Sequence, residues 1–333
     1  MSLYFSFIIP VYNRPQEIKE LLDSFSQLKY DKPYEILIIE DGSIEKSDEV
    51  IKNLSSQLNI KYFFKNNSGP GDSRNYGMQR ADGNYFIILD SDCLLPPQYL
   101  NGVEQSLSED YLDCFGGPDA AHHSFTPLQK AINYVMTSFL TTGGIRGRKK
   151  SIQQFEPRSF NMGISKQAFD TTGGFGKIHP GEDPDLSQRL LKAGFKTGFI
   201  EKAFVYHKRR ISWSKFYKQV RKFGLVRPIL TKWHPTSARI SFWFPFLFVL
   251  FTVGSIFLSF FKIYYFLGFL LLYILILLLD SSIKNKSLYI GFLSILAMFI
   301  QFFGYGLAFA KSTFYIRVLN QNPEKRFPEL FFK

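Results

Sequence analysis

The sequence predicts an α/β fold on a mainly parallel sheet, followed by C-terminal helices that cross a membrane. Short apolar segments alternate with segments of helical periodicity over the first 90 residues. Several of these apolar segments stop abruptly at acidic or polar residues, as strands of an open sheet do at a ligand-binding edge. Beyond residue 241, three long apolar runs follow one another. The chain therefore combines a water-soluble first part with a membrane part.

The first four predicted strands alternate with predicted helices. Each strand is a short run rich in Ile, Phe and Tyr, and Pro15 suits the first turn of the helix that follows the first strand. The predicted strands are Phe5–Pro10, Tyr34–Ile39, Ile60–Phe64 and Tyr85–Leu89. Strand–helix alternation at this spacing predicts right-handed βαβ units and hence parallel pairing.

Two acids follow the fourth strand directly. Asp90 and Asp92 are one residue apart, and Ser91 lies between them. Two carboxylates this close repel each other, and a hard divalent cation with oxygen ligands relieves that repulsion. A solvated turn is the alternative, since Asp and Ser are common in turns. Tyr12, Asn13 and Asp41 also follow predicted strands, so the sequence predicts that these side chains converge on one crevice.

Four segments of the first half resemble the family 2 glycosyltransferases with the GT-A fold. They are IIPVYNRP at 8–15, EDGS at 40–43, GPGDSRNYG at 69–77 and ADGNYFIILDSD at 81–92. Each segment alone is a weak signal, whereas four in this order and spacing are specific. The resemblance implies a Rossmann-like GT-A domain that binds a nucleotide-sugar, with a UDP-sugar as the favoured donor, and Mg²⁺ or Mn²⁺.

The resemblance also implies roles for individual residues. The nucleotide-sugar would be held by Pro10, Val11, Tyr12, Asn13, Asp41, Arg74, Asp90 and Ser91. Asp92 and Asp90 would bind the metal, which neutralises a leaving diphosphate. For Tyr12, packing as an ordinary aromatic residue is the alternative, and for Arg74 a place on a solvated helix face.

The region between residues 111 and 210 contains the other candidate site residues. Gly181-Glu182-Asp183 opens a predicted helix, where acids also favour the helix dipole and can act as simple caps. The resemblance makes Asp183 the base that takes the acceptor proton and Glu182 its orienting neighbour. His207 is either a third metal ligand, as in some relatives, or part of a basic turn. Thr141–Gly147 suits an acceptor loop, and His122 and His123 are expected to be solvated.

The positive charge is concentrated just before the apolar runs. The chain has a formal net charge of +12, and residues 202–239 contain eleven Lys or Arg and no Asp or Glu. Residues 213–223 have the pattern of a basic amphipathic helix, which favours a membrane surface over nucleic acid. The runs Phe242–Phe261, Ile263–Leu279 and Leu288–Ala310 are long enough for spans of roughly 30 Å, although one run could be interfacial or re-entrant.

We therefore expect a GT-A domain over residues 1–210, a basic interfacial linker over 211–240 and a membrane domain over 241–333. The expected function is inverting, metal-dependent transfer of a sugar to a lipid-linked or polysaccharide acceptor. The expected location is the inner (cytoplasmic) membrane, as a multi-pass protein with its catalytic domain in the cytoplasm and lipid as a partner, but no nucleic acid. The alternatives are a processive polysaccharide synthase and a non-catalytic scaffold. The sequence Gln219–Gly224 lacks the Trp of the processive pattern Gln-x-x-Arg-Trp, which counts against the synthase.

Overall fold

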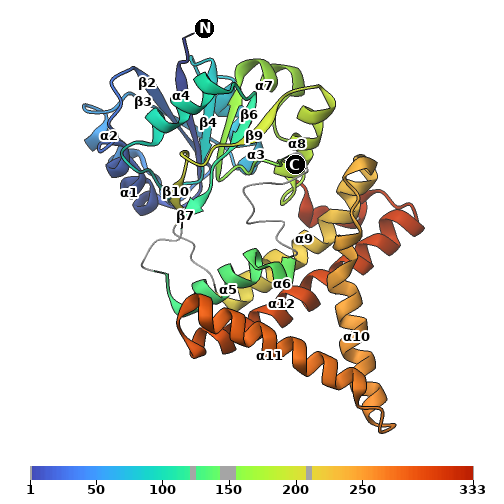
Figure 1. Ribbon diagram of the computed structural model, residues 1–333. Coiled ribbons are helices and arrows are strands. Elements are labelled where there is room, and N and C mark those ends of the chain that lie inside the picture. Colours follow the sequence, from blue (N-terminus) through green and yellow to red (C-terminus); the bar gives the residue numbers. More distant parts are fainter. Residues whose placement is uncertain (1, 121–124, 143–154, 208–211, 333) are drawn as a thin grey trace. The chain divides into compact units, whose positions relative to one another are not determined.

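The computed structural model describes residues 2–120, 125–142, 155–207 and 212–332 (Figure 1). The chain forms two compact units. The first unit comprises residues 1–122, 151–208 and 331–333, and the second comprises 123–150 and 209–330.

Ten strands and six helices of the first unit are described. The strands are β1 (Phe5–Val11), β2 (Tyr34–Asp41), β3 (Ile60–Lys65), β4 (Tyr85–Leu89), β5 (Cys93–Leu94), β6 (Cys114–Gly116), β7 (Asp119–Ala120), β8 (Asn161–Ser165), β9 (Thr197–Phe199) and β10 (Val205–His207). The helices are α1 (Pro15–Phe25), α2 (Asp48–Leu54), α3 (Pro70–Met78), α4 (Tyr99–Glu109), α7 (Lys166–Thr172) and α8 (Glu182–Lys192).

Seven strands form the main sheet, in the order β3-β2-β1-β4-β8-β6-β9. The first four pair in parallel, β8 is antiparallel to both neighbours, and β6 and β9 are again parallel. A small second sheet has the order β5-β10-β7. Because β1, β2 and β4 are adjacent and parallel, the polar residues that follow them lie at one edge of the sheet.

The main sheet is buried on both faces, as parallel sheets are. Alternate residues of β1 show this, since Phe7 and Ile9 enter one apolar core while Ile8 enters another. The first core includes residues of α1 and α4, and the second includes residues of α3, α7 and α8. The near-continuous apolar runs that predicted the strands follow from this double burial.

The predicted fold class is confirmed, and the four predicted strands are β1 to β4. One feature of the sheet was not predicted: β8 runs antiparallel to both of its neighbours, β4 and β6. His122 and His123 lie outside the described residues, and so do Gly143–Gly147 of the predicted acceptor loop. The first two residues of that loop, Thr141 and Thr142, are the last residues of the short helix α6 (Phe139–Thr142).

The second unit is helical. Its longer helices are α5 (Pro127–Thr137), α9 (Trp213–Trp233), α10 (Phe244–Ser259), α11 (Tyr265–Asn285) and α12 (Leu288–Thr313), with short α6 (Phe139–Thr142) and α13 (Pro323–Arg326). Its core joins Ile132 and Val135 of α5 to Phe216 of α9 and Phe302 of α12. Residues 123–150 belong to this second unit, although in sequence they lie between two segments of the first unit.

Three segments of the described chain are long and apolar enough to cross a membrane. They are Ile240–Ser259, Tyr265–Asn285 and Leu288–Val318. The predicted basic helix is the first half of α9, whose apolar face is buried at Phe216 and Val220.

Candidate active site

The loop after β1 is fixed by Asn13. Its backbone lies in the left-handed region (φ 53°), which Asn tolerates better than most residues. Its Oδ1 accepts hydrogen bonds from the backbone N–H groups of Ile44 (2.8 Å) and Glu45 (3.1 Å). The neighbouring Tyr12 remains 52% exposed. Asn13 thus ties the first loop to the loop after β2, and the ring of Tyr12 is accessible to a ligand.

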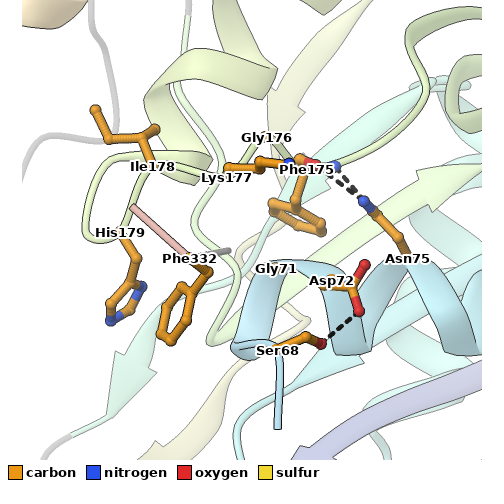
Figure 2. A pocket seen from close by; sticks show the side chains of 10 residues that line it. All are labelled: Ser68, Gly71, Asp72, Asn75, Phe175, Gly176, Lys177, Ile178, His179 and Phe332. Atoms are coloured by element: carbon orange, nitrogen blue, oxygen red, sulfur yellow. Dashed lines mark hydrogen bonds between the residues drawn. The ribbon is translucent and has the colours of Figure 1, made fainter. Parts of the chain in front are cut away.

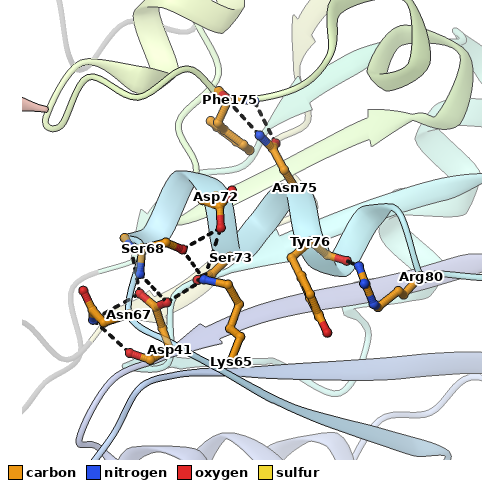
Figure 3. Close-up of polar contacts among 11 residues, drawn as sticks. Asp41, Lys65, Asn67, Ser68, Asp72, Ser73, Asn75, Tyr76, Arg80 and Phe175 are labelled. Atoms are coloured by element: carbon orange, nitrogen blue, oxygen red, sulfur yellow. Dashed lines mark hydrogen bonds and ion pairs between the residues drawn. The ribbon is translucent and has the colours of Figure 1, made fainter. Parts of the chain in front are cut away.

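Asp41, at the end of β2, organises the loop between β3 and α3. The side chain is almost fully buried, and its two oxygens accept four hydrogen bonds (Figure 3). The donors are Lys65 Nζ (2.8 Å), Asn67 Nδ2 (3.3 Å), Ser68 N (3.0 Å) and Gly69 N (2.9 Å). Since two oxygens offer about four lone-pair sites, these four donors occupy the hydrogen-bonding capacity of the carboxylate.

Arg74 joins two groups of acids that are far apart in sequence. It projects from α3 and is almost fully buried. Its Nη2 donates to Asp90 Oδ1 (3.0 Å) and its Nη1 donates to Glu182 Oε1 (3.3 Å). A buried guanidinium needs such partners, so Arg74 fixes the acid after β4 beside the acid that begins α8.

The Asp90–Asp92 segment meets two further elements. Asp92 Oδ2 lies 3.7 Å from Nη1 of Arg14, and the Ser91 hydroxyl donates to Glu17 at the start of α1 (3.2 Å). The pairing of β5 with β10 places the backbone of His207 opposite Cys93, the residue after Asp92. The side chain of His207 lies outside the described residues.

A metal held partly by substrate fits this segment. Among the described side chains, no group of three or more His, Cys, Asp and Glu residues could hold an ion. Mg²⁺ is commonly bound by one or two carboxylates, with substrate phosphates completing its ligands. Asp90 and Asp92 are two such carboxylates at the end of a strand, and the exposed fraction of the Asp90 side chain is 35%.

Glu182 begins α8 and is held in the ionised form. His179 Nδ1 lies 2.9 Å from its Oε1, and Arg74 shares the same oxygen. Burial alone would raise the pKa of Glu182, but the hydrogen bond and charge of His179 and the charge of Arg74 lower it to about 2. The carboxylate is therefore fixed in position and charge.

The pKa of Asp183 is shifted in the opposite direction to that of Glu182. Burial, together with the negative charge of Glu182, raises the pKa of Asp183 to about 6, although the Arg74 charge and hydrogen bonds with Ser159 lower it. Its Oδ1 is buried and has no hydrogen-bond partner among the described residues. A carboxylate with a pKa near neutrality and one unused oxygen is suited to take a proton from a ligand.

A cavity of about 180 Å³ is lined by His179, the hydrogen-bond partner of Glu182 (Figure 2). One wall is the start of α3, including Asp72 and Asn75, and the opposite wall is the loop from Phe175 to His179. Asn75 holds that loop through two hydrogen bonds with the backbone of Phe175 (2.9 and 2.8 Å). The ring of Phe332 closes the cavity at His179, with ring centroids 5.5 Å apart.

The first half of the chain matches a family model. The model is that of glycosyl transferase family 2, and it matches residues 6–173, slightly more than half of the chain. The chain belongs to glycosyl transferase family 2. The match includes the ends of β1, β2 and β4 and stops before Glu182 and Asp183.

Two known proteins are similar in sequence to part of the chain. An uncharacterized glycosyltransferase of Rickettsia bellii (strain RML369-C) is 39% identical over 89 residues, which are 27% of this chain and 13% of that protein. Chondroitin synthase of Escherichia coli is 26% identical over 234 residues, 61% of this chain and 34% of that protein. The chain thus spans about a third or less of these relatives' length.

A solved structure extends the likeness of fold to nearly the whole glycosyltransferase chain. The mannosyltransferase PcManGT from Pyrobaculum calidifontis, in complex with GDP-Man and Mn²⁺, superposes with a TM-score of 0.60. The superposition covers 92% of this chain and 88% of that chain at 13% identity. The predicted GT-A fold is therefore confirmed.

The structure also adds site residues of this glycosyltransferase that were not predicted. Lys65 pairs with Asp41, Arg14 faces Asp92, and His179 binds Glu182. Of these three residues, only His179 could have been predicted from the sequence, because it precedes Glu182 by three residues at the start of a predicted helix. The pairing of Lys65 with Asp41 depends on the register of β2 with β3, which the sequence does not reveal.

Proposed function

We propose that this chain transfers a sugar, with inversion, from a nucleotide-sugar to a lipid-linked or polysaccharide acceptor at the cytoplasmic face of a membrane. The proposal rests on Glu182 and Asp183, two adjacent acids whose pKa values are shifted in opposite directions. Arg74 links Glu182 to Asp90 at the end of β4. Two acids whose surroundings separate their pKa values are the usual mark of an acid–base assignment.

The donor would occupy the edge formed by the ends of β1, β2 and β4. Exposed Tyr12 offers a ring for a nucleobase, and Asp41 holds the loop after β3 against which the base would rest. Pro10, Val11, Asn13 and Ser91 would shape this edge. Arg74 would contribute positive charge near the diphosphate while keeping Asp90 oriented.

The metal would be held by Asp92 and Asp90, with His207 as a candidate third ligand. When bound, Mg²⁺ or Mn²⁺ supplies Lewis-acid neutralisation of the leaving diphosphate. Support comes from the spacing of the two carboxylates and from the Mn²⁺ bound to the mannosyltransferase of similar fold. Its GDP-Man also makes a GDP-sugar a donor to be tested beside the UDP-sugars.

Asp183 would act as the base. Its unpartnered Oδ1 would accept the proton of the acceptor hydroxyl while the hydroxyl oxygen of the acceptor attacks the anomeric carbon of the donor sugar. The bond from that carbon to the diphosphate would break on the opposite face of the sugar, which inverts the configuration. Glu182 stays ionised and raises the proton affinity of Asp183, so it would tune and position the base.

The acceptor and the location are inferred from the second unit. Its three apolar segments favour a membrane location and hence an acceptor available at the membrane. A processive synthase is the second candidate, because chondroitin synthase is among the similar proteins. The incomplete pattern at Gln219–Gly224 counts against it, and retention of every crevice acid counts against a scaffold.

The test is a donor screen. The purified full chain would be mixed with UDP- and GDP-sugars, Mn²⁺ and membrane lipid extract, and release of free nucleotide would be measured. The D183N variant, which keeps the shape of the side chain and removes its basicity, should lower acceptor-dependent release by at least about 10²-fold. D170N, on the exposed part of α7, is the matched control and should match the wild type. If every donor is left intact by the wild type, the proposal fails.

A further inference from the structure

The three apolar helices of the second unit do not lie side by side. α10 and α11 form a hairpin, and α12 lies across its open end (Figure 1). A Cβ on Gly306 of α12 would come within 2.8 Å of Pro245 at the start of α10. A Cβ on Gly291 would come within 2.1 Å of the Ser282 hydroxyl near the end of α11. These two contacts are separated by about 22 Å of helix axis, so α12 connects the two ends of the hairpin.

The hairpin and α12 also differ in exposure. In the most apolar stretch of each segment, 22% is buried for the segment ending with α10 and 17% for α11. The corresponding share is 44% for the segment beginning with α12. Large apolar side chains are exposed along both arms of the hairpin and at its turn, among them Leu250, Phe257, Phe260, Tyr265 and Phe269. The hairpin thus presents an apolar surface on many sides, as a lipid-embedded segment does.

The second half of α12 is covered by the basic helix α9. Contacts along the two helices advance together, from Gly224 against Tyr305, through Leu225 with Ser312, to Lys232 with Ile316. The two helices are therefore parallel neighbours. α9 contains six Lys or Arg and no acid, namely Lys215, Lys218, Arg221, Lys222, Arg227 and Lys232. Since cations are costly in hydrocarbon, α9 and the part of α12 beside it belong at or above the lipid headgroups.

The chain after α12 returns to the first unit. Phe331 forms an antiparallel bridge with Ile178, and the N–H of Phe332 donates to the carbonyl of Lys177 (3.0 Å). A chain that leaves the catalytic unit at residue 208 and rejoins it at residue 331 must cross the bilayer an even number of times. Three crossings are incompatible with this pairing.

We propose that the α10–α11 hairpin is the only described part that enters the bilayer, and that it returns the chain to the catalytic side. α12 then lies along the interface and α9 contacts the anionic headgroups. The occupant of the exposed apolar surface is lipid, because each arm has about the length of the hydrocarbon layer. This inference rests on the membrane location proposed above and adds its topology.

Cysteine accessibility in the full chain tests the topology. The natural Cys93 and Cys114 are buried and leave a low background. Three single variants place a thiol at exposed positions: N53C on α2, K262C at the hairpin turn and Q321C after α12. Membrane vesicles of both orientations would be treated with a membrane-impermeant maleimide, and N53C marks the catalytic side.

The expected result is that Q321C reacts from the same side as N53C, whereas K262C does not react from that side until detergent is added. Reaction of Q321C only from the side opposite N53C would establish three crossings and overturn the proposal. Reaction of K262C from the catalytic side in intact vesicles would show that the hairpin stays outside the bilayer, which also overturns it. Labelling does not depend on catalysis, so failure of sugar transfer would not alter either outcome.

Discussion

Two adjacent carboxyl groups at the start of α8 have opposite proton affinities because their neighbours differ. Glu182 faces the imidazole of His179 and the guanidinium of Arg74, whereas Asp183 is buried beside the negative charge of Glu182. A helix cap would have no need of this separation, since an exposed acid of ordinary pKa suits the helix dipole equally well. The arrangement therefore favours catalysis over capping at these two residues.

The first prediction concerns the base. Since a general base typically contributes about 10²–10⁴ in rate, D183N should lose at least 10² in transfer rate while donor affinity stays intact. E182Q should cost less, because it removes only a charge that tunes the base. Single-turnover transfer and nucleotide-sugar titration measure the two effects. If D183N stays within tenfold of wild type while E182Q is inactive, the roles are reversed.

The second prediction concerns pH. Because Asp183 must be ionised to accept a proton and its pKa is about 6, kcat/KM should rise with pH through about 6 and then level off. In E182Q the negative charge that raises this pKa is gone, so the acidic limb should move to lower pH. D170N should keep the wild-type profile. An unchanged limb in E182Q would assign the limb to a different group.

The third prediction concerns the metal. D92N should lose the gain in donor affinity that Mn²⁺ provides, because the ion needs carboxylate oxygens at this position. Titration calorimetry of the nucleotide-sugar with Mn²⁺ and with chelator measures the gain. Equal affinity of the wild type under both conditions would contradict a metal at this site.

For individual strands, prediction from the sequence succeeded where both faces of the strand are buried. β1 and β4 are buried on both faces, so their apolar runs stand out, and their adjacency follows from the rules for parallel units. The contact of Arg74 with Glu182 joins residues 108 positions apart, and no local pattern indicates it. For the same reason the pairing of Phe331 with Ile178 and the place of α5 in the second unit could not be predicted.

Glycines set how closely the helices of the second unit approach, and this gives the fourth prediction. A Cβ at Gly224 of α9 would lie 2.4 Å from the carbonyl oxygen of Tyr305, whereas a Cβ at Gly268 of α11 would meet nothing within 4 Å. G224A should therefore destabilise the second unit by about 1–3 kcal/mol through overpacking.

G268A is the matched control, because it makes the same chemical change on a helix with open space around it. It should be neutral or slightly stabilising, since Ala favours a helix over Gly by about 1 kcal/mol. Thermal unfolding of both variants in detergent, followed by circular dichroism, measures the difference. Equal melting temperatures would show that α9 and α12 are not packed as closely as described.

For the whole molecule, charge and apolar surface serve different steps of membrane binding. Nearly all of the excess positive charge lies in residues 202–239, and the long apolar helices follow it. Charge attracts the protein to anionic lipid over a distance set by salt, whereas apolar insertion is insensitive to salt. The two contributions can therefore be separated by experiment.

The last prediction separates them. Lys215 and Lys218 are exposed on α9, and replacing both with Gln should weaken the preference of the full chain for anionic over neutral vesicles. Each cation near the surface contributes about 1 kcal/mol, so the ratio of the two affinities should fall roughly 10- to 30-fold at low salt. K19Q with K52Q, exposed on α1 and α2, is the control and should keep the ratio. In 0.5 M NaCl, where screening acts within roughly 4 Å, all three proteins should bind both kinds of vesicle alike. They should also stay bound, because the α10–α11 hairpin remains in lipid. Release of the wild type by salt alone would mean that charge, and not the hairpin, holds the protein on the membrane.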